Sequence, residues 1–372
     1  AWRGRRMRID IATLFTEMCD SVLNESIVGR GIKNGFIEVH THDIRKYTEN
    51  KHRRVDDKPY GGGTGMLMQA QPVYDCISAI KAQREGKPRI IYMSPQGEVL
   101  TQRKVQELAK EPWLVLLCGH YEGIDQRVLD ELEVEELSVG NYVLTGGELP
   151  ALIVADAVAR LQPGVLPNED AYSIESHYNG LLEFPQFTRP EEWRGRKVPD
   201  VLLTGDHRTV TEWQNREALM VTKSKRPDMY DKFIAEQHAR LWRAFLRDKD
   251  MPEDAECSGA VRFGGTAEES DRLVKLVMRG KKRAHLSLQP DALPKRGEYF
   301  IVTDGAGQGR CVVQVFNVRK VPLSGVTEEM CGFTAEFGSV DEWRAGHDGL
   351  SGDTPVVFEQ FRLVYKFHEE ER

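Results

Sequence analysis

The chain has 372 residues, of which 40% are apolar and 29% are charged, and its formal net charge is −7. This mixture is typical of globular proteins and argues against collagen-like, disordered and disulfide-stabilised chains. The longest purely apolar run, residues 113–118, is far shorter than the roughly 20 residues that cross a membrane, so no membrane association is expected. The length favours two or three domains.

The cysteines favour a reducing compartment. None of the six forms a C-x-x-C pair, which disfavours a structural zinc site. Free thiols are usual in the cytoplasm, and no charged-then-apolar leader precedes a small-residue cleavage site. We therefore expect a cytoplasmic protein, and the six residues before Met7 are left out of the fold predictions.

The first part of the chain alternates between apolar runs and helical patterns. In chain order, we predict a strand at 7–14, a helix at 72–83, strands at 89–93 and 113–118 separated by a helix at 102–109, a strand at 138–144, and a helix at 151–161. This repetition is typical of a parallel α/β sheet. The last three strands end in glycine-bearing loops, and ligands of such sheets bind at the carboxyl ends of the strands. These loops are the predicted cofactor site.

The remainder of the chain has a different pattern. Prolines and glycines at 163–167 end the last helix, and a polar stretch to Gly180 is predicted to be an interdomain linker. Residues 202–250 are predicted to be helical, and the charged stretch 249–258 marks a second boundary. Beyond it we expect a helix at 268–279 and short strands at 299–303 and 310–318, as in a small β-rich domain.

Basic side chains gather locally although the net charge is negative. The clusters are Arg45, Lys46, Lys51, Arg53 and Arg54; Arg189, Arg194, Arg196 and Lys197; Lys223, Lys225 and Arg226; and Arg279, Lys281, Lys282 and Arg283. Each cluster is either a solvated surface or a contact for a phosphate backbone.

Several common catalytic motifs do not occur. The glycine-rich segment 61–65 lacks the Gly-Lys-Ser/Thr ending of a P-loop, and no G-x-G-x-x-G opens a helix after a strand. No H-x-x-x-H spacing or G-x-S-x-G elbow is found either. These observations disfavour an NTPase, a dinucleotide-dependent enzyme, a zinc protease and a serine hydrolase.

Six longer motifs together carry a resemblance. They are VDDKPYGGGTGM (55–66), YMSPQG (92–97), CGHYEGID (118–125), SVGNYVLTGGELP (138–150), LLEFPQFTRP (181–190) and KRPD (225–228). In this order and register, the chain from residue 7 to about 250 resembles the bacterial tRNA (guanine-N1)-methyltransferase family, called TrmD.

The resemblance implies a fold, a domain organisation and an activity. It implies an α/β methyltransferase domain of the SPOUT class with a deep trefoil knot at 7–166, a linker at 167–180 and a small helical, tRNA-binding subdomain at 181–250. The implied activity is transfer of a methyl group from S-adenosylmethionine to N1 of guanosine 37 in tRNA. The implied active unit is a homodimer whose active sites are shared between subunits. Whether Mg²⁺ is required stays open.

The resemblance also assigns roles to individual residues. The implied cofactor-binding residues are Tyr92, Met93, Ser94, Pro95, Gly119, Tyr121, Glu122, Gly123, Val139, Gly140, Asn141, Tyr142, Val143, Leu144, Gly146, Gly147 and Pro150. The implied substrate-binding residues are Asp56, Tyr60 and Gly65 for the guanine, and Lys225 and Arg226 for the tRNA backbone.

Two further side chains are implied in catalysis. Arg160 would stabilise negative charge that develops on guanine O6. The proton on N1 needs a carboxylate as general base, and Glu175 stands where the family usually has an aspartate, with Asp170 as the alternative.

Residues 258–372 resemble a different family, the ASCH domains, which have a small β-barrel related to the PUA fold. The similar motifs are RGKKRAH (279–285), GEY (297–299), VTDG (302–305), VTEE (326–329) and DEWR (341–344). The signature G-x-K-x-x-E-x-R departs here, because His285 and Ser287 occupy its last two positions. An accessory RNA contact or a passive appendage is therefore expected. The alternatives for the whole chain are a SPOUT enzyme that methylates another RNA site, and a non-catalytic RNA-binding protein.

Overall fold

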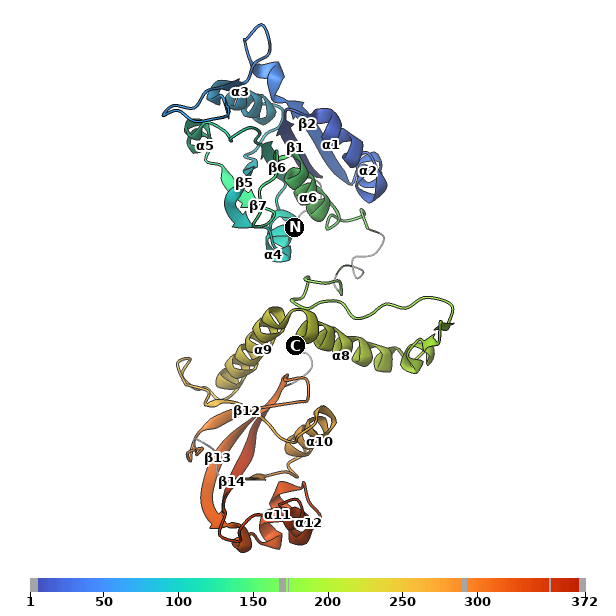
Figure 1. The fold of residues 1–372 in the computed structure, drawn as a ribbon, viewed down its shortest axis with the longest axis vertical. Helices are drawn as coiled ribbons and strands as arrows, with labels where there is room; N and C mark the ends of the chain where they lie inside the picture. The colour runs from blue at the N-terminus through green and yellow to red at the C-terminus, as the bar shows by residue number, and fades with distance from the viewer. Residues whose placement is uncertain (1–5, 167–171, 173, 289–292, 348, 368–372) are drawn as a thin grey trace. The chain divides into compact units, whose positions relative to one another are not determined.

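The chain folds into two compact units, residues 1–179 and 180–372, in a computed structural model (Figure 1). The structure describes all residues except 1–5, 167–171, 173, 289–292, 348 and 368–372. Six of the fourteen residues of the predicted linker, among them the alternative base Asp170, therefore lie outside the described residues. Among the helices of the described part, none combines the length and the apolar character of a membrane span.

The first unit is built on a five-stranded sheet. The strands lie in the order β2-β1-β6-β5-β7 and every pair is parallel, as the alternating pattern predicted. Their bounds are β1 (Met7–Thr13), β2 (Ile37–Asp43), β5 (Arg89–Val99), β6 (Trp113–Cys118) and β7 (Glu135–Ser138). β1 and β6 lie in the middle of the sheet and are buried along their whole length, which explains their continuous apolar sequence.

Helices cover both faces of this sheet (Figure 1). They are α1 (Thr16–Leu23), α2 (Ser26–Lys33), α4 (Gln102–Leu108) and α6 (Glu148–Ala159) on one face, and α3 (Ala70–Lys81) and α5 (Gln126–Glu131) on the other. Alternate residues of β6 point to the two faces: Leu114 and Leu116 join the core under α6, whereas Val115 and Leu117 join the core under α3. Short elements complete the unit: η1 (Ile44–Tyr47), β3 (Asp56–Asp57) and β4 (Leu67–Met68).

Two predicted strand limits were wrong. β5 does not stop at Met93 but continues to Val99, and its pairing with β7 shifts register between Met93 and Glu98. The turn-forming residues 94–97 thus form an irregularity inside a strand rather than its end. The strand predicted at 138–144 is β7, which lies earlier in the chain and ends at Ser138, and the residues after it form an irregular segment.

The second unit begins with a long connection and two helices. Its first elements are β8 (Glu192–Trp193), β9 (Arg196–Lys197), η2 (Asp200–Leu203), α8 (His207–Lys225) and α9 (Pro227–Asp248). β8 and β9 form a two-stranded antiparallel hairpin. Asp206 caps α8 because its carboxylate accepts hydrogen bonds from the backbone N–H groups of Arg208 and Thr209.

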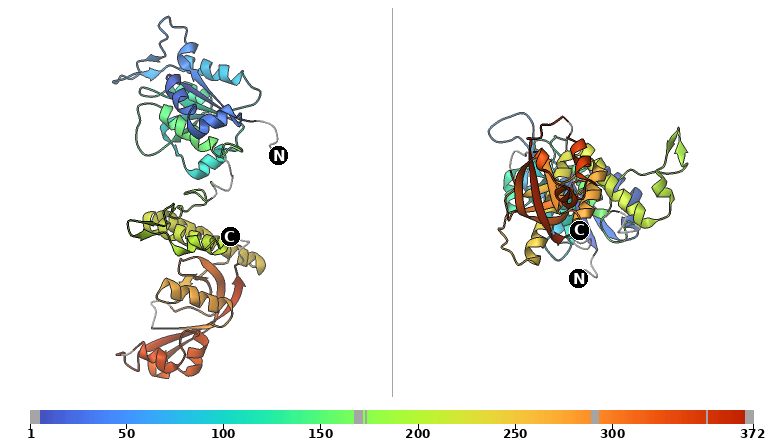
Figure 2. Two further views of the ribbon diagram at one scale, coloured as in Figure 1. Left: turned by 90° about the vertical axis from the view of Figure 1, so that its right-hand side faces the viewer. Right: turned by 90° about the horizontal axis from the view of Figure 1, so that it is seen from below.

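A second five-stranded sheet follows, in the order β10-β12-β13-β14-β11. The remaining elements are β10 (Gly259–Arg262), α10 (Ala267–Met278), β11 (Ala284–Leu288), β12 (Tyr299–Thr303), β13 (Gly309–Pro322), η3 (Leu323–Gly325), α11 (Glu328–Thr334), α12 (Val340–Ala345) and β14 (Pro355–Lys366). The sheet is a half-barrel rather than the small β-barrel expected, since its edge strands β10 and β11 do not pair with each other within the described residues. Its curved strands are drawn in orange and red in Figure 2.

The last helix of the helical part shares a core with this sheet. Leu241 and Phe245 of α9 are fully buried against Ile301, Val312 and Tyr365. The side chain of Gln237 also donates to the backbone oxygen of Gly309 and accepts from its N–H, at 3.0 and 2.9 Å. The domain limits predicted near residues 250–258 stay a prediction, because packing is continuous across them.

Candidate active site

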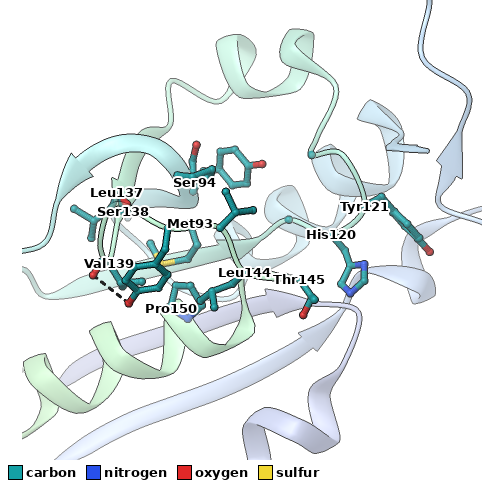
Figure 3. Close-up of a pocket in the computed structure, with 18 of the residues that line it drawn as sticks. Met93, Ser94, His120, Tyr121, Leu137, Ser138, Val139, Leu144, Thr145 and Pro150 are labelled. Carbon is teal, nitrogen blue, oxygen red and sulfur yellow. Dashed lines mark hydrogen bonds between the residues drawn. The ribbon is translucent and has the colours of Figure 1, made fainter. Parts of the chain in front are cut away.

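A pocket in the first unit lies at the carboxyl ends of its central strands. The residues of β5 from Tyr92 onward, the loop after β6, and the segment between β7 and α6 surround it (Figure 3). The lining residues are Tyr92, Met93, Ser94, Pro95, Gly119, His120, Tyr121, Glu122, Gly123, Leu137, Ser138, Val139, Tyr142, Val143, Leu144, Thr145, Gly146, Gly147 and Pro150.

The structure brings together nearly all of the predicted cofactor-binding residues. Only Gly140 and Asn141 do not line the pocket. Four lining residues were missed by the sequence reasoning: His120, Leu137, Ser138 and Thr145. His120 and Thr145 lie between predicted residues, so treating their segments as continuous would have found them. Leu137 and Ser138 are the last residues of β7, just before the first predicted residue of that segment, Val139.

Glycines allow these segments to touch. The N–H of Gly147 donates to the carbonyl of Gly119 at 2.8 Å. His120 and Gly146 form an isolated antiparallel β-bridge. A Cβ on Gly147 would lie 2.7 Å from the Cα of Cys118, which is backbone and cannot turn away. A Cβ on Gly119 would lie 2.7 Å from the ring of Tyr92, itself buried. The closeness of these loops therefore excludes any larger residue at both positions.

The pocket combines apolar walls with polar groups. Leu137, Leu144 and Pro150 supply apolar surface, and Ser138 fixes the turn after β7 by donating to the carbonyl of Gly140 at 2.9 Å. The Nδ1 atom of His120 is buried and has no hydrogen-bond partner in the described part of the chain. Apolar walls, exposed loop backbone and an unpaired polar atom suit an adenosyl group, which has an aromatic face and polar edges.

The two predicted catalytic residues form an ion pair within one chain. Arg160 caps the C-terminus of α6, and its guanidinium donates two hydrogen bonds to the carboxylate of Glu175, at 2.6 and 2.9 Å. These hydrogen bonds lower the pKa of Glu175 and raise that of Arg160. Both side chains are about one-third exposed. Glu175 is thus ionised at neutral pH, as a proton acceptor must be.

The residues predicted to contact guanine lie on a loop that is tied to the pocket. The N–H of Glu122 donates to the carbonyl of Met66, and the N–H of Met68 donates to that of Gly123, both at 3.0 Å. Gly65 consequently lies against the side chain of Glu122 at the pocket. Tyr60, at the start of the same loop, is 99% exposed.

The other predicted substrate contacts are placed as follows. Asp56 lies in β3, with its carboxylate 3.9 Å from the guanidinium of Arg54. Lys225 and Arg226 end α8 in the second unit, and Arg226 pairs with Asp228 at 2.7 Å. The structure therefore brings Gly65, but not Lys225 or Arg226, to the pocket within one compact unit.

Comparison with known families adds independent evidence. The family described as tRNA (Guanine-1)-methyltransferase TrmD matches residues 7–232, and the ASCH domain family matches residues 259–365. The first match contains the pocket, the loop that carries Tyr60, and both Arg160 and Glu175. The second covers the half-barrel and the helices around it.

Individual relatives agree with the first match. Proteins named tRNA (guanine-N(1)-)-methyltransferase from Ruminiclostridium cellulolyticum, Lachnospira eligens and Geobacillus kaustophilus are 54%, 50% and 48% identical to this chain. The aligned regions cover 61%, 61% and 63% of this chain and 97%, 97% and 96% of the relatives. The chain therefore belongs to the TrmD family of tRNA (guanine-1)-methyltransferases, and it carries a C-terminal ASCH domain in addition.

Proposed function

We propose that this protein transfers a methyl group from S-adenosylmethionine to N1 of guanosine 37 in tRNA. The observation that carries the proposal is the three-segment pocket beside the loop of Tyr60 and Gly65, in a chain of the TrmD family. The backbone of Gly119, Gly146 and Gly147 would contact the adenosyl moiety. A trefoil knot formed by these segments is part of the proposal.

The chemistry requires one proton to leave as the methyl group arrives. When bound, S-adenosylmethionine supplies an electrophilic methyl group. Glu175 accepts the proton from guanine N1, and because an ordinary glutamate is already ionised at neutral pH it stays a proton acceptor after it leaves Arg160. Arg160 donates to O6, where negative charge develops. Both residues must turn from each other to the base, which costs little because a partly exposed ion pair contributes at most about 1 kcal/mol.

An apolar surface supports a homodimer with shared active sites. Phe15, Met18 and Val22, from α1 and the residue before it, are 41–54% exposed, and Leu149 and Ile153 of α6 are 48% and 46% exposed. α1 packs beside α6, so these side chains lie on neighbouring helices. Clustered apolar side chains at the surface are typical of a protein interface. We assign this surface to a second copy of the chain.

The remaining parts of the proposal concern tRNA. Lys225 and Arg226 contact the phosphate backbone, and the C-terminal ASCH domain adds an accessory RNA contact. We retain the limits 7–166, 167–180, 181–250 and 258–372 as functional modules. A requirement for Mg²⁺ is tested by chelation during the assay below.

The proposal is tested by identifying the methylated nucleoside. The purified chain is incubated with a tRNA transcript that has guanosine at position 37 and with methyl-labelled S-adenosylmethionine, and the tRNA is digested to nucleosides. We expect 1-methylguanosine, and none from a matched transcript with adenosine at position 37. Label in a ribose or in another base contradicts the proposed site, and absence of label contradicts catalysis.

A further inference from the structure

The β8–β9 hairpin of the second unit presents an aromatic side chain to solvent. Its strands pair Glu192 with Lys197 and Trp193 with Arg196, and Arg194-Gly195 form the turn between them. Both turn residues have positive φ, 51° and 76°, which is the conformation of tight two-residue hairpins. The hairpin comes shortly before η2 and the start of α8 (Figure 1).

Nothing in the described chain covers this hairpin. Every residue from 185 to 197 is exposed, and the side chain of Trp193 is 60% exposed. The one aromatic or cation–π contact of Trp193 is with the guanidinium of Arg194, whose Cζ lies 5.0 Å from the ring centroid. An indole that a two-stranded hairpin holds in water contributes little to the stability of the fold, which leaves it available for a partner.

The two faces of the hairpin differ in charge. Directly opposed residues share a face, so Trp193 and Arg196 lie on one face and Glu192 and Lys197 on the other. Glu192 and Lys197 neutralise each other at 4.0 Å. Among the described residues, neither Arg194 nor Arg196 has an ion pair with a carboxylate. The face that carries the indole is therefore positively charged, and the opposite face is balanced.

We propose that the Trp193 face of this hairpin binds tRNA, with the indole stacked on an unpaired base and Arg196 and Arg194 on adjacent phosphates. An exposed aromatic ring beside unpaired arginines is the combination by which proteins bind single-stranded RNA. The positive charge of this face complements the negatively charged phosphate backbone of an RNA. A protein surface with few acidic side chains would offer no such complementary charge. The inference rests on the proposed function, because it takes tRNA as the substrate.

The test compares substitutions on the two faces of the full-length chain. Trp193→Ala should weaken binding of a fluorescently labelled tRNA about 5- to 100-fold, since stacking on one base contributes about 1–3 kcal/mol. Trp193→Phe keeps an aromatic face and should stay within about threefold of the unmodified chain. Arg196→Gln should weaken binding and reduce the slope of log affinity against log salt by about one. Lys197→Gln also removes one positive charge, but from the face on which Lys197 is paired with Glu192. It should change neither the affinity for tRNA nor its salt dependence.

Binding of S-adenosylmethionine and the sedimentation coefficient are measured for each variant. Both should stay unchanged. Unaltered tRNA affinity in Trp193→Ala, or equal effects of Arg196→Gln and Lys197→Gln, would overturn the inference while the unmodified chain still methylates tRNA. A changed oligomeric state in Trp193→Ala would assign the face to a second copy instead and likewise overturn it. If the unmodified chain neither binds nor methylates tRNA, the proposed function itself fails.

Discussion

The pocket and the loop at residues 60–65 are neighbours in the first unit, but they are built in opposite ways. In the pocket, Gly119 packs against the ring of Tyr92 and Gly147 packs against the backbone of Cys118. Even one added carbon at either glycine would collide with these atoms. In the loop, a Cβ on Gly61, Gly62 or Gly63 would meet no atom within 4 Å, and Tyr60 is almost fully exposed. Only the last glycine of the loop, Gly65, lies close to another segment, at the side chain of Glu122. The pocket is therefore tightly packed, whereas the loop from Tyr60 to Gly63 is open.

This contrast separates the two halves of the proposed reaction. The cofactor half is the three-segment pocket, and the guanine half is the loop of Tyr60 and Gly65 together with the proposed tRNA contacts. The pocket proposed to bind the cofactor is assembled by contacts within a single chain, so we expect it to be formed before any ligand arrives. In the proposed guanine site, Tyr60 lies in solvent whereas Asp56 is partly buried, and the proposed tRNA-backbone contacts Lys225 and Arg226 belong to the other compact unit. The guanine half is completed only by tRNA and, in our proposal, by a second copy of the chain. Substitutions should therefore affect the two halves separately.

The largest effect is expected at the catalytic pair. Glu175→Gln removes the proton acceptor at nearly constant size, and Arg160→Ala removes the stabilisation of O6. Each should lower kcat by roughly two to four orders of magnitude, as for other lost general bases and oxyanion contacts. Single-turnover methylation measures the effect. Titration with S-adenosylmethionine is the control, since unchanged affinity shows that the cofactor half is intact.

Mixing these two inactive variants tests whether a site uses both chains. If Arg160 and Glu175 act from opposite subunits, a mixed dimer has one site with both lesions and one with neither, and activity returns after subunit exchange. If both act from one chain, as their ion pair in the isolated chain would allow, every site stays damaged. Absence of recovery in a verified mixed dimer would contradict the shared site.

A smaller but still large effect is expected in the packed loops. Gly147→Ala places a methyl group 2.7 Å from the Cα of Cys118 and should separate the loops of the pocket. We expect the affinity for S-adenosylmethionine to fall about 5- to 150-fold, which corresponds to the usual overpacking cost of about 1–3 kcal/mol. Gly62→Ala is the control in the open loop. Its φ of +81° strains an alanine, but that strain is confined to the loop and should leave the affinity for S-adenosylmethionine unchanged. Equal losses in both variants would remove the distinction between the two regions.

The exposed side chain of the open loop should affect tRNA alone. Tyr60→Ala is expected to raise KM for tRNA about 5- to 50-fold, because an aromatic stacking partner for a base is lost. Tyr60→Phe should behave like the unmodified chain, and neither change should alter cofactor affinity. A loss of cofactor affinity in Tyr60→Ala would show that this residue belongs to the cofactor half.

The smallest effect is a shift in pH dependence. The hydrogen bonds from Arg160 lower the pKa of Glu175, so the ionised base persists as the pH falls until it reaches that lowered pKa. Arg160→Lys keeps the charge but cannot donate in the same bidentate way. The pKa of Glu175 should then rise toward its ordinary value, and the acid limb of the kcat/KM profile should move to higher pH. An acid limb that does not move would assign that ionisation to another group.

The sequence predicted the sheet well where local pattern and packing agree. The run 113–118 is apolar because both faces of β6 are buried, and its limits were predicted correctly. The helix predicted at 151–161 is present as α6, which begins at Glu148 and has Pro150 in its first turn. The strand expected at 138–144 failed for a physical reason. Val143 is 81% exposed, so the apolar residues of this segment line the pocket or face solvent and do not enter the sheet.

The lining of the pocket was largely predictable from the sequence, whereas its role as the cofactor site stays a prediction. Motifs in register implied most of the lining residues, because each motif is a continuous segment at the end of a strand. They could not show that Arg160 and Glu175 pair within one chain, since the pair joins a helix end to the linker across 15 residues. They also gave no sign that α9 would share its core with the ASCH domain through Phe245. Contacts of this kind depend on the folded backbone.

The most direct test of the central claim is a calorimetric titration of the purified chain with S-adenosylmethionine in the absence of tRNA. Because the pocket is assembled by contacts within one chain, we predict saturable binding without RNA. Glu175→Gln should retain this binding, and Gly147→Ala should lose most of it while still unfolding cooperatively. Binding that appears only after tRNA is added would contradict the claim that the cofactor half is complete before the substrate arrives.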